Sequence, residues 1–149
     1  NSACTGTYLP WNNLIGEGLV NYGFQKPAAE LVKRLMTGII QSLKNEGAFR
    51  RSYHANTGQG IGERNALGGL APLGLFMQVL GVRLISPYRI ALSGINPFPW
   101  TVTIKYRGLT VLRQKEKTIV IFPDGQTVVV NDPKPQIVAL EVQQATPGT

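Results

Sequence analysis

The chain has 149 residues, 43% hydrophobic and only 15% charged, a composition typical of a globular chain with much buried surface. Its 15 Lys and Arg exceed its 8 Asp and Glu and give a formal charge of +7, but the basic residues are dispersed from Lys26 to Lys134, which excludes a clustered nucleic-acid footprint. The longest uncharged stretch, residues 66–82, is too short and too rich in glycine to span a bilayer, so we expect neither a nucleic-acid nor a membrane partner.

The cysteine content and the first residues bear on the compartment and on the parent protein. Cys4 is the only cysteine, so the chain forms no intrachain disulfide, and we expect a cytoplasmic location, no metal and no cofactor. The chain begins with the polar Asn1-Ser2 and has neither an initiator Met nor the basic start of a signal peptide. We therefore expect a remainder of a parent chain as one of its partners.

The first half of the chain has the apolar period of helices. One helix is expected over residues 11–22, ending at Gly23, and a second begins near Pro27 and ends at Gly47. The second helix has one apolar stripe, formed by Leu31, Val32, Leu35, Met36, Ile39, Ile40 and Leu43. Because few residues join these helices, they are predicted to form an antiparallel hairpin. A third helix is expected over residues 73–80, starting beside Pro72.

A glycine-rich segment separates the second helix from the third. The periodicity stops between Phe49 and Arg64, and Gly58-Gln59-Gly60-Ile61-Gly62 predicts a loop there. A dinucleotide fingerprint needs a strand before the glycines and a helix directly after them, and a P-loop needs Gly-Lys-Ser/Thr. Neither pattern is present, so a tight structural loop is favoured over nucleotide binding.

After Gly81 the pattern changes to period two with β-branched residues, which predicts strands. The expected strands cover residues 89–92, 101–106, 109–113, 118–122, 127–130 and 136–141, and Pro123-Asp124-Gly125-Gln126 is a hairpin turn. Six short antiparallel strands are typical of a sandwich or half of one. The predicted class is therefore α+β, with a helical segment over residues 1–81 and an antiparallel β module over residues 82–149.

Several polar and aromatic residues are candidates for binding a ligand. The single histidine, His54, lies in a polar segment between helices, where it could bind a sugar hydroxyl or accept a proton, or simply bond to its own backbone. Tyr8, Trp11 and Tyr53 could stack on sugar rings at a common rim. Phe98 and Trp100 are expected to seal the helical part against the strands.

Carboxylates are scarce, although glycoside cleavage ordinarily requires two of them. Glu17 lies on the first helix, and Glu63 precedes the third helix in the glycine-rich segment. Glu63 is the expected catalytic residue because Tyr53 and His54 flank its loop. A charge at the helix N-terminus, paired with Arg64, is the alternative interpretation of Glu63.

Three motifs resemble a known group of enzymes. The run Tyr8-Leu9-Pro10-Trp11-Asn12-Asn13-Leu14-Ile15-Gly16-Glu17-Gly18-Leu19-Val20-Asn21-Tyr22-Gly23 resembles a late helix of (α/α) six-hairpin glycosidases, which include trehalase-like, α-glucosidase-like and glycogen-debranching-like enzymes. Tyr53-x-x-x-Thr57-Gly58-x-Gly60 is similar to their Tyr-Asn-Pro-x-Thr-Gly loop. Leu75-Phe76-Met77-Gln78-Val79-Leu80-Gly81-Val82, followed by strands, is similar to their last barrel helix and C-terminal β module, including that of α-rhamnosidase-like enzymes.

The resemblance implies the C-terminal part of a glycoside hydrolase, with carbohydrate as the ligand and the general acid upstream. One departure is important: several of these families have a catalytic glutamate two residues before the loop tyrosine, where this chain has Arg51. Either Glu63 is the nearest substitute, or the chain is a non-catalytic carbohydrate-binding or structural module. In both cases an incomplete barrel would expose apolar helices, from which we expect self-association.

Overall fold

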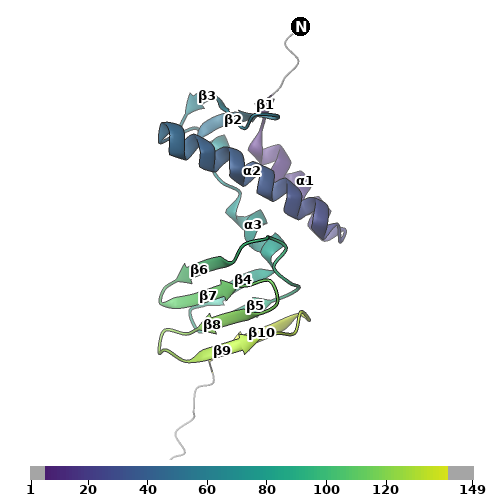
Figure 1. The fold of residues 1–149 in the computed structure, drawn as a ribbon, viewed down its shortest axis with the longest axis vertical. Coiled ribbons are helices and arrows are strands. Elements are labelled where there is room, and N and C mark those ends of the chain that lie inside the picture. The colour runs from purple at the N-terminus through teal and green to yellow at the C-terminus, as the bar shows by residue number, and fades with distance from the viewer. Residues whose placement is uncertain (1–5, 141–149) are drawn as a thin grey trace, which may run out of the picture. The chain divides into compact units, whose positions relative to one another are not determined.

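A computed structural model describes residues 6–140 of the chain (Figure 1). The chain divides into two compact units, Asn1–Val79 and Leu80–Thr149, and each is described by itself. Unit 1 contains two long helices and a small antiparallel sheet, and unit 2 contains two further antiparallel sheets. The α+β class predicted from the sequence is confirmed at this level.

The two long helices of unit 1 form the predicted hairpin. Helix α1 covers Leu9–Asn21 and helix α2 covers Gln25–Glu46, so α2 begins two residues before Pro27. Helix α2 ends at Gly47, which has the left-handed φ of 62° that favours glycine and donates its N–H to the Leu43 carbonyl at 3.0 Å. The core between the helices and the small sheet contains Leu9, Leu35, Ile39 and Tyr53.

The segment predicted to be a loop over residues 49–64 is instead a β-hairpin, and that prediction was wrong. Strands β2 (Arg50–His54) and β3 (Gly60–Arg64) pair antiparallel, and the short β1 (Gly6–Thr7) pairs with the other edge of β2. The glycines of β3 allow side chains of β2 to lie directly against the backbone of β3. A Cβ at Gly60 would meet the Arg50 side chain at 2.2 Å, so only glycine fits there.

The connection to unit 2 is partly helical. A 3₁₀ turn, η1, covers Leu67–Gly69, and helix α3 covers Leu73–Leu80, directly after Pro72 as predicted. The predicted start of α3 is confirmed. Glu63 is ten residues away from it, so the interpretation of Glu63 as a charge at the N-terminus of this helix was wrong.

Over its described residues, 80–140, unit 2 has seven strands in two antiparallel sheets. One sheet has the order β10-β5-β4, with β4 at Val82–Ser86, β5 at Arg89–Leu92 and β10 at Gln136–Ala139. The other has the order β6-β7-β8-β9, with β6 at Val102–Tyr106, β7 at Leu109–Arg113, β8 at Thr118–Ile121 and β9 at Thr127–Val130. All six strands predicted for this part are confirmed to within two residues where the structure describes them, and β4 is the additional one. Residue 141, the predicted end of the last strand, lies outside the described residues.

Each sheet of unit 2 buries one face, as the period-two pattern requires. The buried aliphatic residues come from both sheets and include Val82, Ile90, Leu92, Leu109, Val111, Val120, Val130 and Val138. Phe98 is buried as well, and Trp100 stacks on it with ring centroids 5.5 Å apart. Both aromatic residues thus belong to the structure of unit 2 itself.

Arg113 is a charged residue inside this apolar layer. Its side chain is turned inward at the end of β7, and the whole residue is only 4% exposed. The guanidinium donates to the carbonyl oxygens of Leu80, Ser93 and Gly94 at 3.1, 2.5 and 2.8 Å and to the Thr118 hydroxyl at 2.6 Å. Burial lowers the pKa of this guanidinium below its ordinary value. Four bonds to neutral acceptors therefore compensate its desolvation and tie β7 and β8 to the segments flanking β4 and β5.

Candidate functional site

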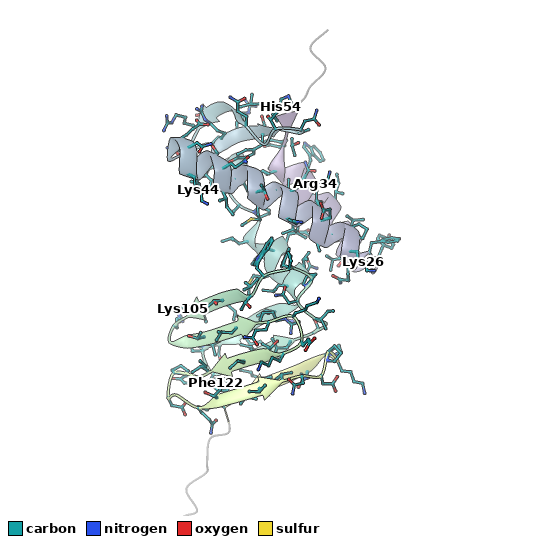
Figure 2. The ribbon with its side chains drawn as sticks, viewed as in Figure 1. Lys26, Arg34, Lys44, His54, Lys105 and Phe122 are labelled. Atoms are coloured by element: carbon teal, nitrogen blue, oxygen red, sulfur yellow. The ribbon has the colours of Figure 1, made fainter. Side chains whose placement is uncertain are left out.

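A polar cavity of unit 1 lies between helix α2 and the turn that joins β2 to β3. It has a volume of about 680 Å³, and Tyr53 and His54 are among its lining residues, as is Leu9 of α1. Asn12, Arg34, Thr37, Gln41, Asn56 and Thr57 supply its polar groups. In Figure 2, His54 lies at the end of unit 1 that holds the small sheet, and Arg34 lies farther along α2. None of the residues that line this cavity is acidic.

Two glycines bring the turn against the helix. Gly38 of α2 is buried, and its Cα lies 3.4 Å from the position that a Cβ on Gly58 would take. The same Cβ would meet Oε1 of Gln41 at 2.9 Å, and Gly58 has a left-handed φ of 70°. Glycine at both positions lets the backbone of the turn lie directly on α2, which forms one wall of the cavity.

Replacing Gly58 should therefore loosen unit 1. Gly58→Ala is expected to cost about 1–2 kcal/mol in the free energy of unfolding, because alanine is strained at positive φ and its Cβ crowds Gln41. Gly74→Ala in α3 is the matched control, since nothing lies within 4 Å of its added Cβ and alanine favours the helix. Denaturant unfolding followed by circular dichroism at 222 nm measures both. Equal midpoints for the two variants would contradict a strained turn.

His54 has a defined tautomer in this turn. Its Nδ1 accepts the backbone N–H groups of Asn56 and Thr57, both at 3.3 Å. A ring nitrogen that accepts is unprotonated, so the proton of the neutral imidazole is on Nε2, which is then a donor. This arrangement bears out the alternative that the backbone satisfies His54 locally, and it leaves Nε2–H as the group that a ligand could use.

Tyr53 lies in the core of unit 1, with 4% of its surface exposed. Its hydroxyl accepts the backbone N–H of Arg50 at 3.1 Å and donates to the Gly69 carbonyl at 3.4 Å. A ring buried in this way packs against the helices. The stacking of Tyr53 on a sugar ring, expected from the sequence, does not fit this burial.

The aromatic residues of α1 lie outside this cavity. Tyr8 caps the N-terminus of α1, is 39% exposed and has its ring against Gly68. Trp11 is 66% exposed on the surface of the helix. Neither is among the residues that line the cavity with Tyr53 and His54. The structure thus brings Tyr53 and His54 together and leaves Tyr8 and Trp11 apart from them.

Glu63 occupies a β-bulge on the exposed part of β3. Arg50 pairs with Arg64 and Ser52 pairs with Ile61, so two residues of β3, Gly62 and Glu63, oppose the single residue Arg51. Gly62 has the positive φ of 84° that such a bulge uses. Glu63 therefore presents its carboxylate from the strand beside Arg51.

Glu63 and His54 are at opposite ends of the hairpin. Gly60, three residues before Glu63, pairs with Tyr53, so at about 3.3 Å per residue the two sites are separated by roughly 10 Å or more along the strands. Arg64, proposed from the sequence as the ion-pair partner of Glu63, instead donates to the Glu46 carbonyl at 2.7 Å. A loop, which the sequence predicts for this segment, would not fix the distance between Glu63 and His54. The paired strands β2 and β3 do fix it.

Glu17 lies in a different, apolar groove of unit 1. This groove has a volume of about 630 Å³, and its lining includes Leu14, Leu67, Leu70 and Leu73 as well as Glu17. Oε1 of Glu17 accepts a hydrogen bond from the Asn13 side chain at 2.8 Å. Glu63 does not line this groove, so the two candidate carboxylates do not share a site.

Comparison with known proteins assigns no family to the chain. No family model, curated protein or solved structure matches it. Within residues 6–140, no helix combines the length and the apolar character needed to cross a membrane. In the same part of the chain, no three or more His, Cys, Asp or Glu side chains gather in a way that could hold a metal ion.

Proposed function

We propose that the chain is the C-terminal part of a larger carbohydrate-active enzyme, in which unit 1 contributes late helices of an (α/α) barrel. The observation that carries this proposal is the apolar surface of α1. Trp11, Leu14, Ile15 and Tyr22 are 66, 58, 57 and 84% exposed, and they lie at helical spacing. An exposed apolar helix face marks a surface that another part of a protein covers. Neighbouring barrel helices are the occupants that the sequence resemblance implies.

The bulge supports a role for Glu63 in hydrolysis. The resemblance implies a catalytic glutamate at position 51, and the chain has Arg51 there with Glu63 directly across on β3. Bulges are frequent next to active sites because they redirect a side chain. In the proposed enzyme, Glu63 is the general base, and the general acid comes from the upstream part of the barrel.

The polar cavity beside His54 supports the binding of carbohydrate. Nε2 of His54 donates, and Asn12 and Gln41 can both donate and accept, which suits the hydroxyl groups of a sugar. The Thr37 hydroxyl donates to the Lys33 carbonyl at 2.8 Å, so it can only accept from a sugar. Thr57 and Asn56 extend this polar lining along the turn. In this proposal the cavity orients a sugar ring without taking part in bond cleavage.

A non-catalytic carbohydrate-binding module is the second candidate. The absence of acidic residues from the lining of the His54 cavity favours it, since cleavage requires two carboxyl groups on either side of one bond. In this alternative Arg51 marks a site that lacks a base, and Glu63 is a surface charge. Both candidates share carbohydrate as ligand and the remainder of the parent chain as partner.

The isolated chain is expected to bind sugars without cleaving them. A panel of aryl α- and β-glycosides should show no turnover above the blank, because the two candidate carboxylates, Glu17 and Glu63, do not line a common cavity. NMR titration with the same panel should give saturable shifts at the side chains of His54 and Gln41. His54→Ala should weaken this binding by about tenfold, the effect of losing one good hydrogen bond.

Three results would contradict this proposal. Turnover that Glu17→Gln or Glu63→Gln abolishes would show that the chain already contains a complete active site. The absence of saturable shifts for every sugar would show that the chain does not bind carbohydrate. A monodisperse monomer that binds no hydrophobic dye would show that α1 has no uncovered apolar face.

A further inference from the structure

The two sheets of unit 2 have four edge strands, and only two of them are protected. Proteins usually guard an exposed edge with a charged residue, a proline or a bulge, because unpaired backbone groups attract other strands. Strand β4 carries Arg83 and a register shift between Leu84 and Ser86, and β6 carries Lys105 in its interior. Strands β9, Thr-Val-Val-Val, and β10, Gln-Ile-Val-Ala, have no charge, no proline and no register shift.

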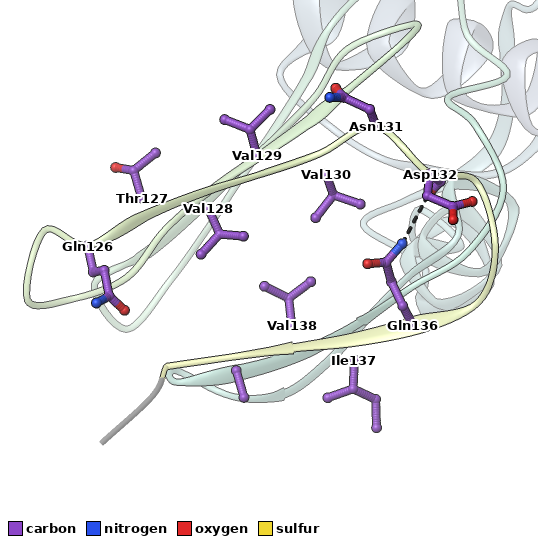
Figure 3. A pocket seen from close by; sticks show the side chains of 11 residues that line it. Gln126, Thr127, Val128, Val129, Val130, Asn131, Asp132, Gln136, Ile137 and Val138 are labelled. Carbon is purple, nitrogen blue, oxygen red and sulfur yellow. Dashed lines mark hydrogen bonds between the residues drawn. The ribbon is translucent and has the colours of Figure 1, made fainter. Parts of the chain in front are cut away.

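The two unguarded edges lie on either side of one groove. It has a volume of about 640 Å³ and is lined by residues 126–132 and 136–139. Figure 3 shows Val128 and Val130 of β9 and Val138 of β10 pointing into the space between the strands. Val129 and Ile137 point away from it and are 52 and 54% exposed. The groove therefore combines an aliphatic floor with backbone edges that pair with no strand of the described chain.

One end of the groove carries a carboxylate. Asp132 is the only charged residue among those that line the groove, and it also lines a small adjoining pocket with Lys115, Glu116 and Lys117. One carboxylate oxygen of Asp132 accepts the Lys134 backbone N–H at 2.9 Å, and the Asp132 carbonyl accepts from the Gln136 side chain at 3.0 Å (Figure 3). The Lys134 N–H thus holds the Asp132 carboxylate in place, two residues beyond the end of β9. A basic side chain at this end of an added strand would complement it.

We propose that the free edge of β9 binds an extended segment of another polypeptide. The segment adds antiparallel to β9 over about four residues, roughly 13 Å of strand. Its alternate aliphatic side chains lie beside the buried Val130 and cover Val128, which is half-buried, and a Lys or Arg at its N-terminal end meets Asp132. This binding site is independent of the carbohydrate site and of the enzyme proposed above.

A peptide copied from β8 tests this directly, since β8 already pairs with the opposite edge of β9. In the chain, Thr118 pairs with Val130 and Ile121 with Thr127. The N-terminal end of β8, where Lys117 lies, is therefore at the same end of β9 as Asp132. The probe is fluorescein-Lys-Lys-Thr-Ile-Val-Ile-amide, titrated with the full chain by fluorescence anisotropy. We expect saturable binding, and the alternate amides of β9 that do not bond to β8 should become protected from hydrogen exchange.

Variants and modified peptides define the binding mode. Val128→Lys should weaken binding at least about tenfold, because it places a charge in the aliphatic groove. Val129→Thr is the control and should change the affinity by less than about twofold, since this side chain points away. Asp132→Asn should lower the affinity a few-fold and reduce its salt dependence.

The peptide itself supplies a test that requires no folded variant. In an antiparallel pair only every second residue directs its N–H to a given neighbour. N-methylation of one alternate set of residues should therefore abolish binding, and methylation of the other set should be tolerated. No saturable binding, or equal effects of both methylated peptides, would overturn the proposal. If the peptide does not bind, and the chain dimerises with concentration in a way that Val128→Lys prevents, the partner of the β9 edge is a second copy of the chain.

Discussion

If the proposed function is correct, Glu63→Gln in the full-length parent protein is expected to keep the fold and lower kcat by roughly a hundredfold to ten-thousandfold. This is the range for losing general acid–base assistance, and glutamine retains the size of the side chain without accepting a proton. The carboxylate is exposed on the β3 bulge, so its replacement leaves no buried group without a partner. Steady-state kinetics and thermal melting of the same preparation measure the two effects separately.

The matched control for this variant is Glu30→Gln, which is also an exposed glutamate of unit 1. Glu30 pairs only with Arg34 on the surface of α2, so its replacement should change the unfolding free energy by about 0.5 kcal/mol or less and leave kcat unchanged. If Glu63→Gln behaves in the same way as this control, Glu63 is a surface charge. The alternative of a non-catalytic module then becomes the better description of the chain.

A double variant at Arg51 and Glu63 tests the same assignment of the general base. The bulge places Gly62 and Glu63 opposite Arg51, so a carboxylate and a guanidinium occupy adjacent strands where the resemblance implies a single glutamate. If the base has moved from β2 to β3, the double change Arg51→Glu with Glu63→Gln should restore part of the activity that Glu63→Gln removes. No recovery leaves the two positions functionally unrelated. Neither outcome depends on the peptide site of unit 2.

The strands of unit 2 could be predicted from the sequence because their patterns are local. Val111 and Val120 are opposed in the register, and each is turned inward in the alternation that the sequence displays. The turn at Gly125 contains the Asp124 side chain bonded to the Gln126 N–H, as the turn residues indicate. Strand β4, Val82–Ser86, was missed because Pro87 follows it directly and indicates a break.

The candidate site of unit 1 could not be predicted to the same extent, because tertiary contacts determine it. Gly60 and Gly62 indicate a loop when only propensity is considered, yet one accommodates the Arg50 side chain and the other forms the bulge. This hairpin buries Tyr53 and separates His54 from Glu63. Gln41 was overlooked because it is an exposed polar residue on a helix, and no local pattern shows that it borders the His54 cavity.

Arg113 was missed although the sequence contains a signal for it. Leu109, Val111 and Arg113 share one face of β7, so the alternation places a guanidinium on the buried side of a strand. A charge at such a position must find several hydrogen-bond acceptors, because an unpaired buried charge is strongly unfavourable. The carbonyl groups that solve this problem come from residues 80, 93 and 94, which no local pattern connects to β7.

Arg113→Met is expected to destabilise unit 2 by about 3–5 kcal/mol. Methionine fills similar volume but leaves the carbonyls of Leu80, Ser93 and Gly94 and the Thr118 hydroxyl without their donor, and each buried group that loses its partner costs about 1–3 kcal/mol, with some relief from water. Arg113→Lys should be intermediate, because an ammonium supplies charge but cannot span four acceptors in one plane. Arg83→Met on the exposed face of β4 is the control, expected within about 0.5 kcal/mol of the parent.

The two tryptophans allow this loss to be measured in unit 2 alone. Trp11 belongs to unit 1 and Trp100 to unit 2, where it stacks on Phe98, so Trp100 fluorescence in a Trp11→Phe background reports the unfolding of the β module. Denaturant titration should show a lower midpoint for Arg113→Met with an unchanged m-value, since the surface exposed on unfolding stays similar. The helical signal of unit 1 at 222 nm should keep its midpoint. A loss below about 1 kcal/mol would mean that water replaces the guanidinium at its four acceptors, and that Arg113 does not hold the two sheets together.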